Sequence, residues 1–586
     1  MSEGAQADRL ESPSGLRIEL AANGCVRRID HGEVLLNTVL GNELEGGLIN
    51  LYLRRHDGGE ICSTPLIGPR GALRRLRRSE DRREWVGEWL GLRCQVALVL
   101  AQTAATWFWQ VSVDNGGSSA ASIDLIYAQD TALSSYGAVR NNEYYVSQYV
   151  DHAPLTHPRQ GDVLAVRQNL AVGGRHPWAM IGALDKAISY ETDGLQFYGL
   201  TQRAGQLPQA LAAPRLAGIR RQHEHSMAGL QQQVVSLAPG ASWRGGFFCW
   251  FEPDHPQASS AADLSYVDRA LALPEAGCSS NFVTASDDSE IPAATLFTIA
   301  PLLAAQALRQ TEITARFGSD LRQVERSEAG EVLSFFTGTT PPGHVVLRDK
   351  ELTVLRPHGH IIRSGNQLVP DERSLTSNTW MSGIFHSLVT EGHVNINRLL
   401  SNPHGYLSAM RVAGQRLFVE IDGVFHLLDV PSAYVMTPNT ATWIYRWDQG
   451  ELEVRSWAGV ERHELGLAIA ITGGAPRRLL LAQHVAIDGD DGAAGGTVTY
   501  ERHGSRIEIR PRPDSELGRR FPHGWFEIDL GDRAAIEQVG GDELLFRDGR
   551  SRQQPVVTVV THPLARLDVR ITGHLVSSAR APRSRS

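Results

Sequence analysis

The sequence predicts a mainly β protein, with two large antiparallel β-sandwich domains joined by a helical linker. Many short stretches alternate apolar and polar residues, turn-forming residues separate them, and the pattern is interrupted once by a segment rich in alanine, leucine and glutamine. At 586 residues the chain is also too long for one core. We therefore expect β-sandwich domains at 15–256 and 345–575, a helical linker at 257–344, and flexible tails at 1–14 and 576–586.

The first domain shows the strand pattern clearly. Residues 106–113 alternate, which places Trp107 and Trp109 on one face of a strand. The turn residues 114–117, Asp-Asn-Gly-Gly, follow directly, and a further strand is expected at 122–128. Strands joined by such short turns predict a sandwich rather than an alternating α/β fold.

The linker is expected to contain two helices. The stretches 259–273 and 293–316 are rich in alanine, leucine and glutamine, which favour helix. Pro301 lies inside the second stretch and should kink the helix or divide it in two, because proline removes a backbone donor.

The second domain contains two hairpin signals. In 418–428 the pair Asp422-Gly423 separates two β-rich stretches, which predicts a two-residue hairpin. In 442–457 the turn ends with Gly450, which we expect to adopt the left-handed conformation. Several more short strands are expected after it.

The composition excludes several classes of partner. The formal net charge of −8 argues against nucleic acid, because its binding proteins concentrate basic residues. The five cysteines lie far apart and have no metal-ligand spacing, so we expect no disulfide framework, metal or other cofactor. Residues 1–11 lack the apolar stretch of a secretory signal, and the apolar stretch 291–308 contains two prolines and suits a buried helix better than a membrane span. We expect a cytoplasmic protein without a membrane partner.

The segment 136–157 combines residue types that suit a sugar site. Planar side chains donate to and accept from pairs of hydroxyl groups, and aromatic faces cover the C–H surface of a sugar ring. A polar connection between strands, packed by tyrosines, would use the same residues, so both interpretations stay open. The expected ligand-binding residues are Arg140, Asn141, Asn142, Tyr144 and His152.

A second segment, 380–404, holds three histidines, three asparagines, an arginine and a tryptophan. That is more polar and aromatic character than a plain strand needs. Histidines hydrogen-bonded within the fold would explain the same pattern, and this alternative also stays open. The expected ligand-binding residues are Trp380, His386, His393, Asn397 and Arg398.

Three carboxylates in these segments are candidate catalytic groups. Inverting cleavage of a glycosidic bond needs a protonated carboxyl and a base, roughly 6.5–9.5 Å apart. The candidates are Glu143, Asp151 and Glu391, with His152 or His393 as proton partners.

The segments 140–152, 373–401 and 415–423 resemble the non-barrel portion of the inverting glycoside phosphorylases. That group includes the cellobiose, cellodextrin and chitobiose phosphorylases and the cyclic β-1,2-glucan synthases. The resemblance covers most of 15–575. It implies a mutarotase-like β-supersandwich, a helical linker and a catalytic α-helical barrel, with a barrel aspartate as general acid and inorganic phosphate as nucleophile.

The chain departs from this family pattern after Val345, where no stretch offers the series of long amphipathic helices that a barrel needs. The resemblance therefore implies a carbohydrate-active protein that binds β-linked gluco-oligosaccharides and lacks the catalytic barrel, as a split subunit or partial enzyme. Its expected partners are an oligosaccharide and either a separate barrel-bearing chain or a second copy of itself, with inorganic phosphate as co-substrate.

Two other functions stay open at this point. One is a stand-alone sugar enzyme whose chemistry lies on a sandwich, as in mutarotase-like enzymes, hydrolases or transglycosylases. The other is a carbohydrate-binding or assembly protein without catalysis.

Overall fold

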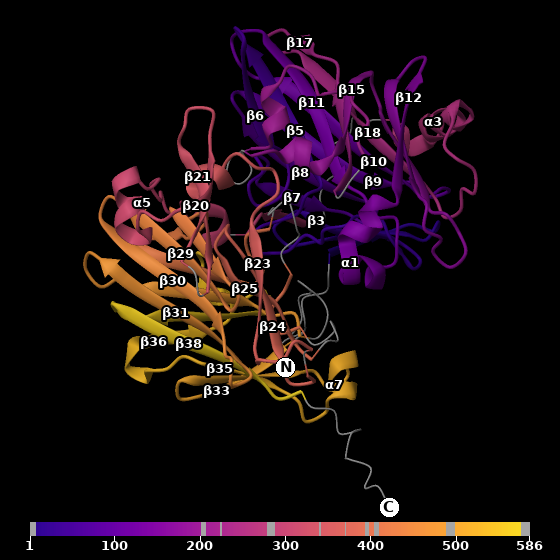
Figure 1. Cartoon of the computed structure of the whole chain (residues 1–586). Helices are drawn as coiled ribbons and strands as arrows, with labels where there is room; N and C mark the ends of the chain where they lie inside the picture. The colour runs from indigo at the N-terminus through magenta and orange to yellow at the C-terminus, as the bar shows by residue number, and fades with distance from the viewer. Residues whose placement is uncertain are drawn as a thin grey trace, which may run out of the picture. The chain divides into compact units, whose positions relative to one another are not determined.

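The computed structural model divides the chain into two compact units, 1–293 and 294–586 (Figure 1). Each unit is mostly strand, and the large sheets are antiparallel apart from one parallel pairing between neighbouring strands in unit 1, so the predicted fold class is confirmed. The structure describes residues 8–200, 207–222, 225–277, 287–292, 294–338, 341–369, 371–392, 398–402, 410–487 and 498–575.

Unit 1 contains one small and one large sheet in its described part. Strands β1 to β4 form the small sheet. The large sheet has the order β19-β7-β8-β9-β10-β18-β14-β13-β15-β16-β11-β5-β6, with β12 beside β13 and β17 beside β11. The strands are β1 (Asp8–Glu11), β2 (Leu16–Leu20), β3 (Val26–His31), β4 (Val34–Leu35), β5 (Asn50–Asp57), β6 (Glu60–Pro65), β7 (Arg75–Arg78), β8 (Arg82–Trp89), β9 (Leu92–Leu100), β10 (Thr106–Asn115), β11 (Ala121–Asp130), β12 (Val150–His157), β13 (Gly161–Gln168), β14 (Trp178–Ala183), β15 (Ala187–Asp193), β16 (Ser226–Gln232), β17 (Val235–Leu237), β18 (Ser242–Glu252) and β19 (Asp287–Glu290). The helices are α1 (Tyr136–Gln148), α2 (Gly194–Tyr198) and α3 (Ser265–Leu271), with 3-10 turns at Gln209–Ala212, Ala261–Leu264 and Pro274–Ala276.

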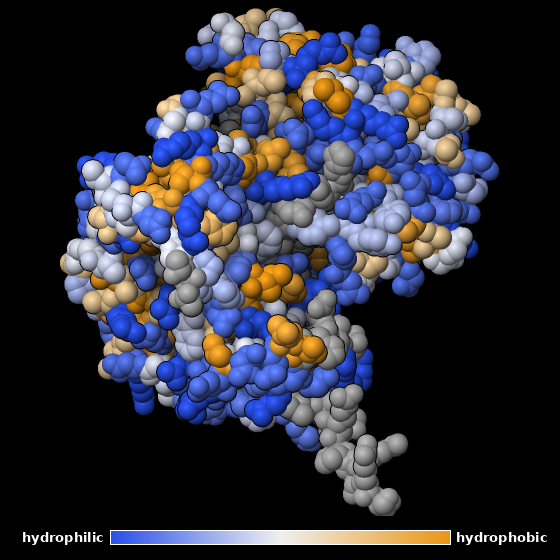
Figure 2. All heavy atoms as spheres, viewed as in Figure 1, coloured by the Kyte–Doolittle hydropathy of each residue, from blue (hydrophilic) through white to orange (hydrophobic). Residues whose placement is uncertain are grey.

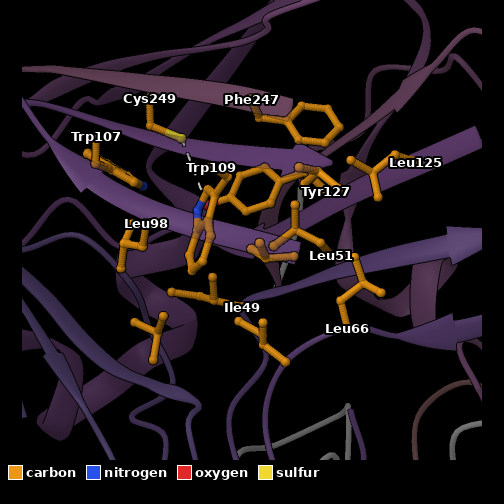
Figure 3. Packing of buried hydrophobic residues seen from close by; sticks show 14 of the residues in the cluster. Ile49, Leu51, Leu66, Leu98, Trp107, Trp109, Leu125, Tyr127, Phe247 and Cys249 are labelled. Atoms are coloured by element: carbon orange, nitrogen blue, oxygen red, sulfur yellow. Dashed lines mark hydrogen bonds between the residues drawn. The ribbon is translucent and has the colours of Figure 1, made fainter. Parts of the chain in front are cut away.

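A series of aromatic side chains packed against one another forms the centre of the hydrophobic core of unit 1 (Figure 3). Trp109 lies 5.7 Å from Trp85 and 6.4 Å from Tyr127 between ring centroids, and Tyr127 stacks on Phe247 at 5.4 Å. These residues face one side of the sheet, as the alternation in β10 predicts. Phe108 on the other side is buried too, because α3 packs there. The central strand is therefore apolar on both faces.

A buried ion pair ties a loop to the sheet in unit 1. The guanidinium of Arg54 donates to both carboxylate oxygens of Asp124, at 2.8 and 2.5 Å, and both side chains are fully buried. Arg54 also donates to the carbonyls of Leu211 and Pro214, at 3.0 and 3.1 Å. The buried charges are thus paired and hydrogen-bonded, as burial demands.

Unit 2 contains three sheets in its described part. The orders are β20-β21-β22-β28-β29-β30-β31-β38-β35-β34-β33, then β23-β24-β25, and β27-β26-β32-β37-β36. The strands are β20 (Arg322–Arg326), β21 (Val332–Thr337), β22 (Gly343–Leu347), β23 (Gly359–Arg363), β24 (Leu375–Trp380), β25 (Ile384–Glu391), β26 (Gln415–Ile421), β27 (Val424–Leu427), β28 (Ala433–Thr437), β29 (Thr440–Trp447), β30 (Gly450–Ala458), β31 (Glu464–Gly473), β32 (Leu479–His484), β33 (Val498–His503), β34 (Arg506–Pro511), β35 (Phe526–Asp529), β36 (Ile536–Gly540), β37 (Val556–Thr561) and β38 (Arg566–Gly573). The helices are α4 (Leu296–Ile299), α5 (Gln310–Phe317), α6 (Arg348–Glu351) and α7 (Glu516–Arg520), with 3-10 turns at Arg533–Ala535 and Asp542–Leu544.

The region expected to be a helical linker, 257–344, is divided between the units. Its first helix, α3, packs on the sheet of unit 1, and β20 and β21 join the large sheet of unit 2. Residues 301–309 form no helix, in contrast to the prediction, and only α4 and α5 form on either side. The reason is that the backbone of Leu303 donates to the Leu427 carbonyl at 2.8 Å, so the segment pairs with β27.

Both predicted hairpins form, but the left-handed conformation predicted for Gly450 in the second was wrong. Asp422 and Gly423 both have positive φ, 51° and 79°, as a two-residue turn of this kind requires. In the second hairpin Trp447 pairs with Gly450, so Gly450 is part of β30 and has no positive φ. A β-carbon at Gly450 would lie 2.7 Å from the Gly473 carbonyl oxygen, so close packing is what requires this glycine.

The surface is mainly hydrophilic on the face shown in Figure 2, with apolar residues in small patches. None of the helices in the described ranges is long and apolar enough to cross a membrane.

Candidate functional site

The first predicted site segment forms helix α1 followed by strand β12. Ser135 caps the helix by accepting from the Ala138 backbone at 3.3 Å. Asn142 then leaves the helical conformation, with φ −159° and ψ 86°, and its side chain accepts from the Tyr145 backbone at 3.0 Å. Asn142 therefore acts as a second cap and kinks the helix, because its side chain replaces a backbone partner.

The kinked helix presents two aromatic rings to solvent. Tyr145 and Tyr149 are 49% and 38% exposed, and their ring centroids lie 4.9 Å apart. Of the residues predicted here, Asn141 and Asn142 are exposed, while Arg140, Glu143 and Tyr144 are half-buried. The prediction named Tyr144 as a ligand residue. The structure exposes the rings of Tyr145 and Tyr149 more than that of Tyr144.

Strand β12 points its two candidate residues in opposite directions. Asp151 accepts from Arg220 at 2.6 Å and from Gln222 at 2.5 Å near the surface. His152 is buried and lies 3.1 Å from the Ser226 hydroxyl. Burial lowers the pKa of His152 to about 4, so this histidine is neutral at pH 7. Asp151 is thus accessible to a ligand, and His152 supports the strand.

The second predicted segment is only partly described. His393 and Asn397 lie outside the described residues. Trp380 ends β24, and its ring lies against Gly359, where a β-carbon would be 2.9 Å away. Arg398 is buried. Trp380 is therefore the described candidate of this segment that keeps a partly exposed side chain.

His386 has both ring nitrogens bound within the protein. Its Nε2 donates to the Gly466 carbonyl at 3.0 Å, and its Nδ1 accepts from the Ser377 hydroxyl at 2.9 Å. Burial lowers the pKa of His386 to about 4, so the ring is neutral. This arrangement matches a hydrogen-bonded structural histidine and leaves no ring nitrogen for a sugar.

Glu391 is the candidate carboxylate with the strongest shift in acidity. Burial raises its pKa to about 7, although the Leu575 backbone donates to it at 2.8 Å and the charge of Arg373 opposes the shift. A carboxyl with such a pKa can donate or accept a proton near neutral pH. In the described structure Glu391 also anchors the chain just beyond β38.

Unit 2 contains a cavity of about 470 Å³ that the sequence did not single out. Its lining residues come from β30, β31 and β38. These three strands run side by side (Figure 1). We call the cavity the β31 trough. The small residues of β31 form its floor, and the longer side chains of β30 and β38 form its walls. It is lined by Glu453, Arg455, Trp457, Ala468, Ile469, Ala470, Arg566, Asp568, Val569 and Arg570.

The strand register explains the shape of the trough. Arg455 lies opposite Ala468, and Ala468 lies opposite Asp568, so a small residue separates two long ones in each row. At one end, Gly466 stands between Trp457 and Arg570. The sequence signal was present, because β31 alternates large inward residues with small outward ones. It could not be interpreted without knowing that β38 is its neighbour.

Each of the two units matches a known protein-domain family. Residues 19–249 match the SOGP N-terminal domain, and residues 320–573 match the glycoside phosphorylase supersandwich domain. The second unit therefore contains a glycoside phosphorylase-related supersandwich region. A curated relative is the 1,2-beta-oligoglucan phosphorylase of Listeria innocua serovar 6a, which is 26% identical over 497 residues. The match covers 85% of this chain and 43% of the relative, so the chain spans less than half of that phosphorylase.

Several solved structures match this chain weakly. A polysaccharide lyase is 9% identical with a TM-score of 0.26, covering 76% of this chain and 47% of the lyase. A bacterial glucoamylase complexed with acarbose is 8% identical with a TM-score of 0.28, and the match covers 46% of this chain and 35% of the glucoamylase. A galactose mutarotase related enzyme from Lactobacillus acidophilus is 7% identical with a TM-score of 0.23, and the match covers 44% of this chain and 100% of that enzyme.

Proposed function

We propose that this chain is a carbohydrate-active protein of glycoside phosphorylase type that binds β-linked gluco-oligosaccharides. The observation that carries the proposal is the pair of domain matches along the chain, together with a relative named for 1,2-β-oligoglucans. The exposed tyrosine pair on α1 supports it, because aromatic faces pack on sugar rings. Asp151 beside Arg220 supplies hydroxyl acceptors and donors in the same unit.

We further propose that the described residues bind saccharide and that a catalytic barrel lies outside them. The longest helix among the described elements is α1, with 13 residues and a kink, so these elements do not build a helical barrel. Phosphorolysis needs a positioned acid and a cradle for inorganic phosphate, the expected co-substrate. In this proposal a barrel-bearing chain or segment provides both, in the cytoplasm, and a homodimer is the alternative partner.

A stand-alone sandwich enzyme is the second candidate function, and one observation favours it. Glu391 has a pKa of about 7 and is therefore suited to acid–base work. Against it stands the contact with the Leu575 backbone, which already uses one carboxylate oxygen. The two functions make different predictions for catalysis by the chain alone.

Titration calorimetry with β-1,2- and β-1,4-linked gluco-oligosaccharides tests binding. We expect Arg140→Ala or Trp380→Ala to weaken the affinity about 5–150-fold, the effect of losing roughly 1–3 kcal/mol of buried hydrogen bonding or packing. Arg326→Ala, at an exposed arginine on β20, is the matched control and should bind normally. Affinity unchanged in both site variants would remove these residues from the site.

Phosphorolysis assays distinguish the two functions. We expect sugar-phosphate formation from cellobiose or sophorose-type disaccharides to stay at background with the purified chain alone. Adding a barrel-bearing chain should produce turnover and a stable complex. Turnover by the chain alone that is lost in Glu143→Gln, Asp151→Asn or Glu391→Gln would instead establish the sandwich enzyme.

A further inference from the structure

We propose that the β31 trough is a gluco-oligosaccharide-binding site, separate from the two segments discussed above. The class of sugar rests on the proposed function, but the site itself rests on the geometry of unit 2. Its features are a hollow of about 470 Å³, an aromatic ring at one end, and charged side chains along both walls.

The floor of the trough is shaped for an extended ligand. Gly466, Ala468 and Ala470 follow one another on the outward face of β31; the Trp457 ring covers Gly466, and the two alanines leave space between the walls. The distance from the first to the last is roughly 13 Å, four residues of an extended strand. From the inner side, His386 donates to the Gly466 carbonyl and holds the floor in place. The hollow is therefore long, narrow and backed by a fixed strand.

Trp457 supplies an aromatic face at the Gly466 end. A β-carbon at Gly466 would lie 2.1–2.4 Å from three atoms of the indole ring, so the ring lies directly on the glycine. This contact holds the ring flat against the floor, and Trp457 is only partly buried. A fixed and partly exposed indole can pack against the C–H face of a sugar ring, because it gives contact area at small cost in side-chain entropy.

The walls offer hydrogen-bonding groups that the described protein does not use. Arg455, Arg570 and Glu453 have no side-chain hydrogen-bond or ion-pair partner among the described residues. Arg566 and Asp568 pair with each other at 2.7 and 3.2 Å. The two guanidinium groups present planar N–H donors, and the free carboxylate presents acceptors. Vicinal hydroxyl groups of a sugar accept and donate in the same way.

The charge pattern favours a neutral saccharide over a polyanion. Carboxylates of Glu453 and Asp568 alternate with the arginines around the trough, so a chain of phosphates or sulfates would meet negative charge along its length. A neutral polyhydroxyl ligand can use both kinds of group. An apolar peptide could pack against Trp457, but the charged side chains of the walls would give it little further apolar contact.

The face of the sheet that carries the trough is polar, and it is not an apolar surface left without a covering helix. On the neighbouring strands the same face is apolar and covered by α5, as Ile444 on β29 shows by packing with Ile313. Ile444 stands opposite Glu453 in the register, so the face changes from apolar to charged between β29 and β30. The polar lining therefore begins where the helical cover ends.

Calorimetry on the full chain with β-linked gluco-oligosaccharides of increasing length tests the trough. We expect Trp457→Ala and Arg455→Gln each to weaken binding about 5–150-fold, with unchanged circular dichroism, since both side chains lie on the surface. Arg462→Ala, an exposed arginine in the β30–β31 connection, is the matched control. Ligand should also shift the tryptophan fluorescence of the unaltered chain, and this shift should be smaller in Trp457→Ala.

The outcomes separate this inference from the proposed function. Normal binding in both trough variants would overturn the trough as the site and leave the proposed function standing. No binding of any gluco-oligosaccharide by the unaltered chain would overturn both. Tighter binding of polyphosphate than of glucan, released by salt, would overturn the assignment of a neutral saccharide.

Discussion

Replacing Glu391 by glutamine should change how the stability of the protein depends on pH. Burial raises the folded-state pKa of Glu391 to about 7 from its usual 4.5, so the fold favours the protonated carboxyl. The stabilisation from this group is complete below the unfolded pKa of 4.5 and is lost as the pH rises through about 7. In Glu391→Gln the ionisation is absent, and the amide oxygen can still accept from the Leu575 backbone.

The shift in pKa sets the size of the effect. A difference of this size between folded and unfolded states corresponds to about 3 kcal/mol across the titration. We therefore expect Glu391→Gln to be more stable than the unaltered protein by about 2–3 kcal/mol near pH 8.5, and to differ little near pH 5. The opposing charge of Arg373 is already included in the pKa of about 7, so it does not reduce this gain further.

Urea unfolding at a series of pH values, followed by tryptophan fluorescence, measures the effect. Glu328→Gln, at an exposed position of unit 2, is the control and should keep the pH dependence of the unaltered protein. The reasoning is refuted if Glu391→Gln keeps that dependence as well. A variant that is less stable at every pH would show instead that the carboxylate, bound to Leu575, is the stabilising form.

Three further predictions concern packing and accessibility. Arg54→Ala should destabilise unit 1 by about 3–5 kcal/mol, because the buried Asp124 carboxylate loses its guanidinium partner and keeps the neutral amide of Gln231 as a donor; a smaller loss in urea unfolding would contradict this. Gly466→Val should displace the Trp457 ring, seen as a fluorescence change in a folded protein, and should weaken glucan binding. In a Cys278→Ser variant, Cys62 should be the only described thiol that reacts rapidly with a maleimide under native conditions, since the other described cysteines are buried; fast labelling of more than one thiol would be the contrary result.

Local signals in the sequence predicted local structure well. The hairpin at Asp422 and Gly423 was predictable, because a two-residue turn restricts both backbone conformations to values that these residues tolerate. The glycine in the next hairpin was misread because close contact with a neighbouring strand requires it, and sequence alone does not show that neighbour. The stretch 301–309 was misread for a similar reason, since pairing with β27 overrides its helical propensity.

The candidate site was less predictable than the fold. The number of polar residues around His386 suggested a ligand site, but both ring nitrogens bind within the protein, which composition does not reveal. The kink at Asn142 comes just before the exposed tyrosine pair, and a single side-chain hydrogen bond from the Tyr145 backbone accompanies it. The β31 trough combines β30 and β31 with β38, which follows about a hundred residues later. A site formed by strands so far apart in sequence is visible only after their pairing is known.

The pairing of β19 with β7 affects how unit 1 can be produced as an isolated protein. Residues 287–290 return to the far edge of the large sheet, and Arg78 donates to the Ser289 hydroxyl at 2.6 Å. A fragment that ends at 256, where the strand pattern first fades, would lack this strand and expose the backbone of β7 as a free edge. Such an edge can pair with other molecules, so this fragment should aggregate. A fragment that continues to residue 292 keeps the edge covered and should stay monomeric.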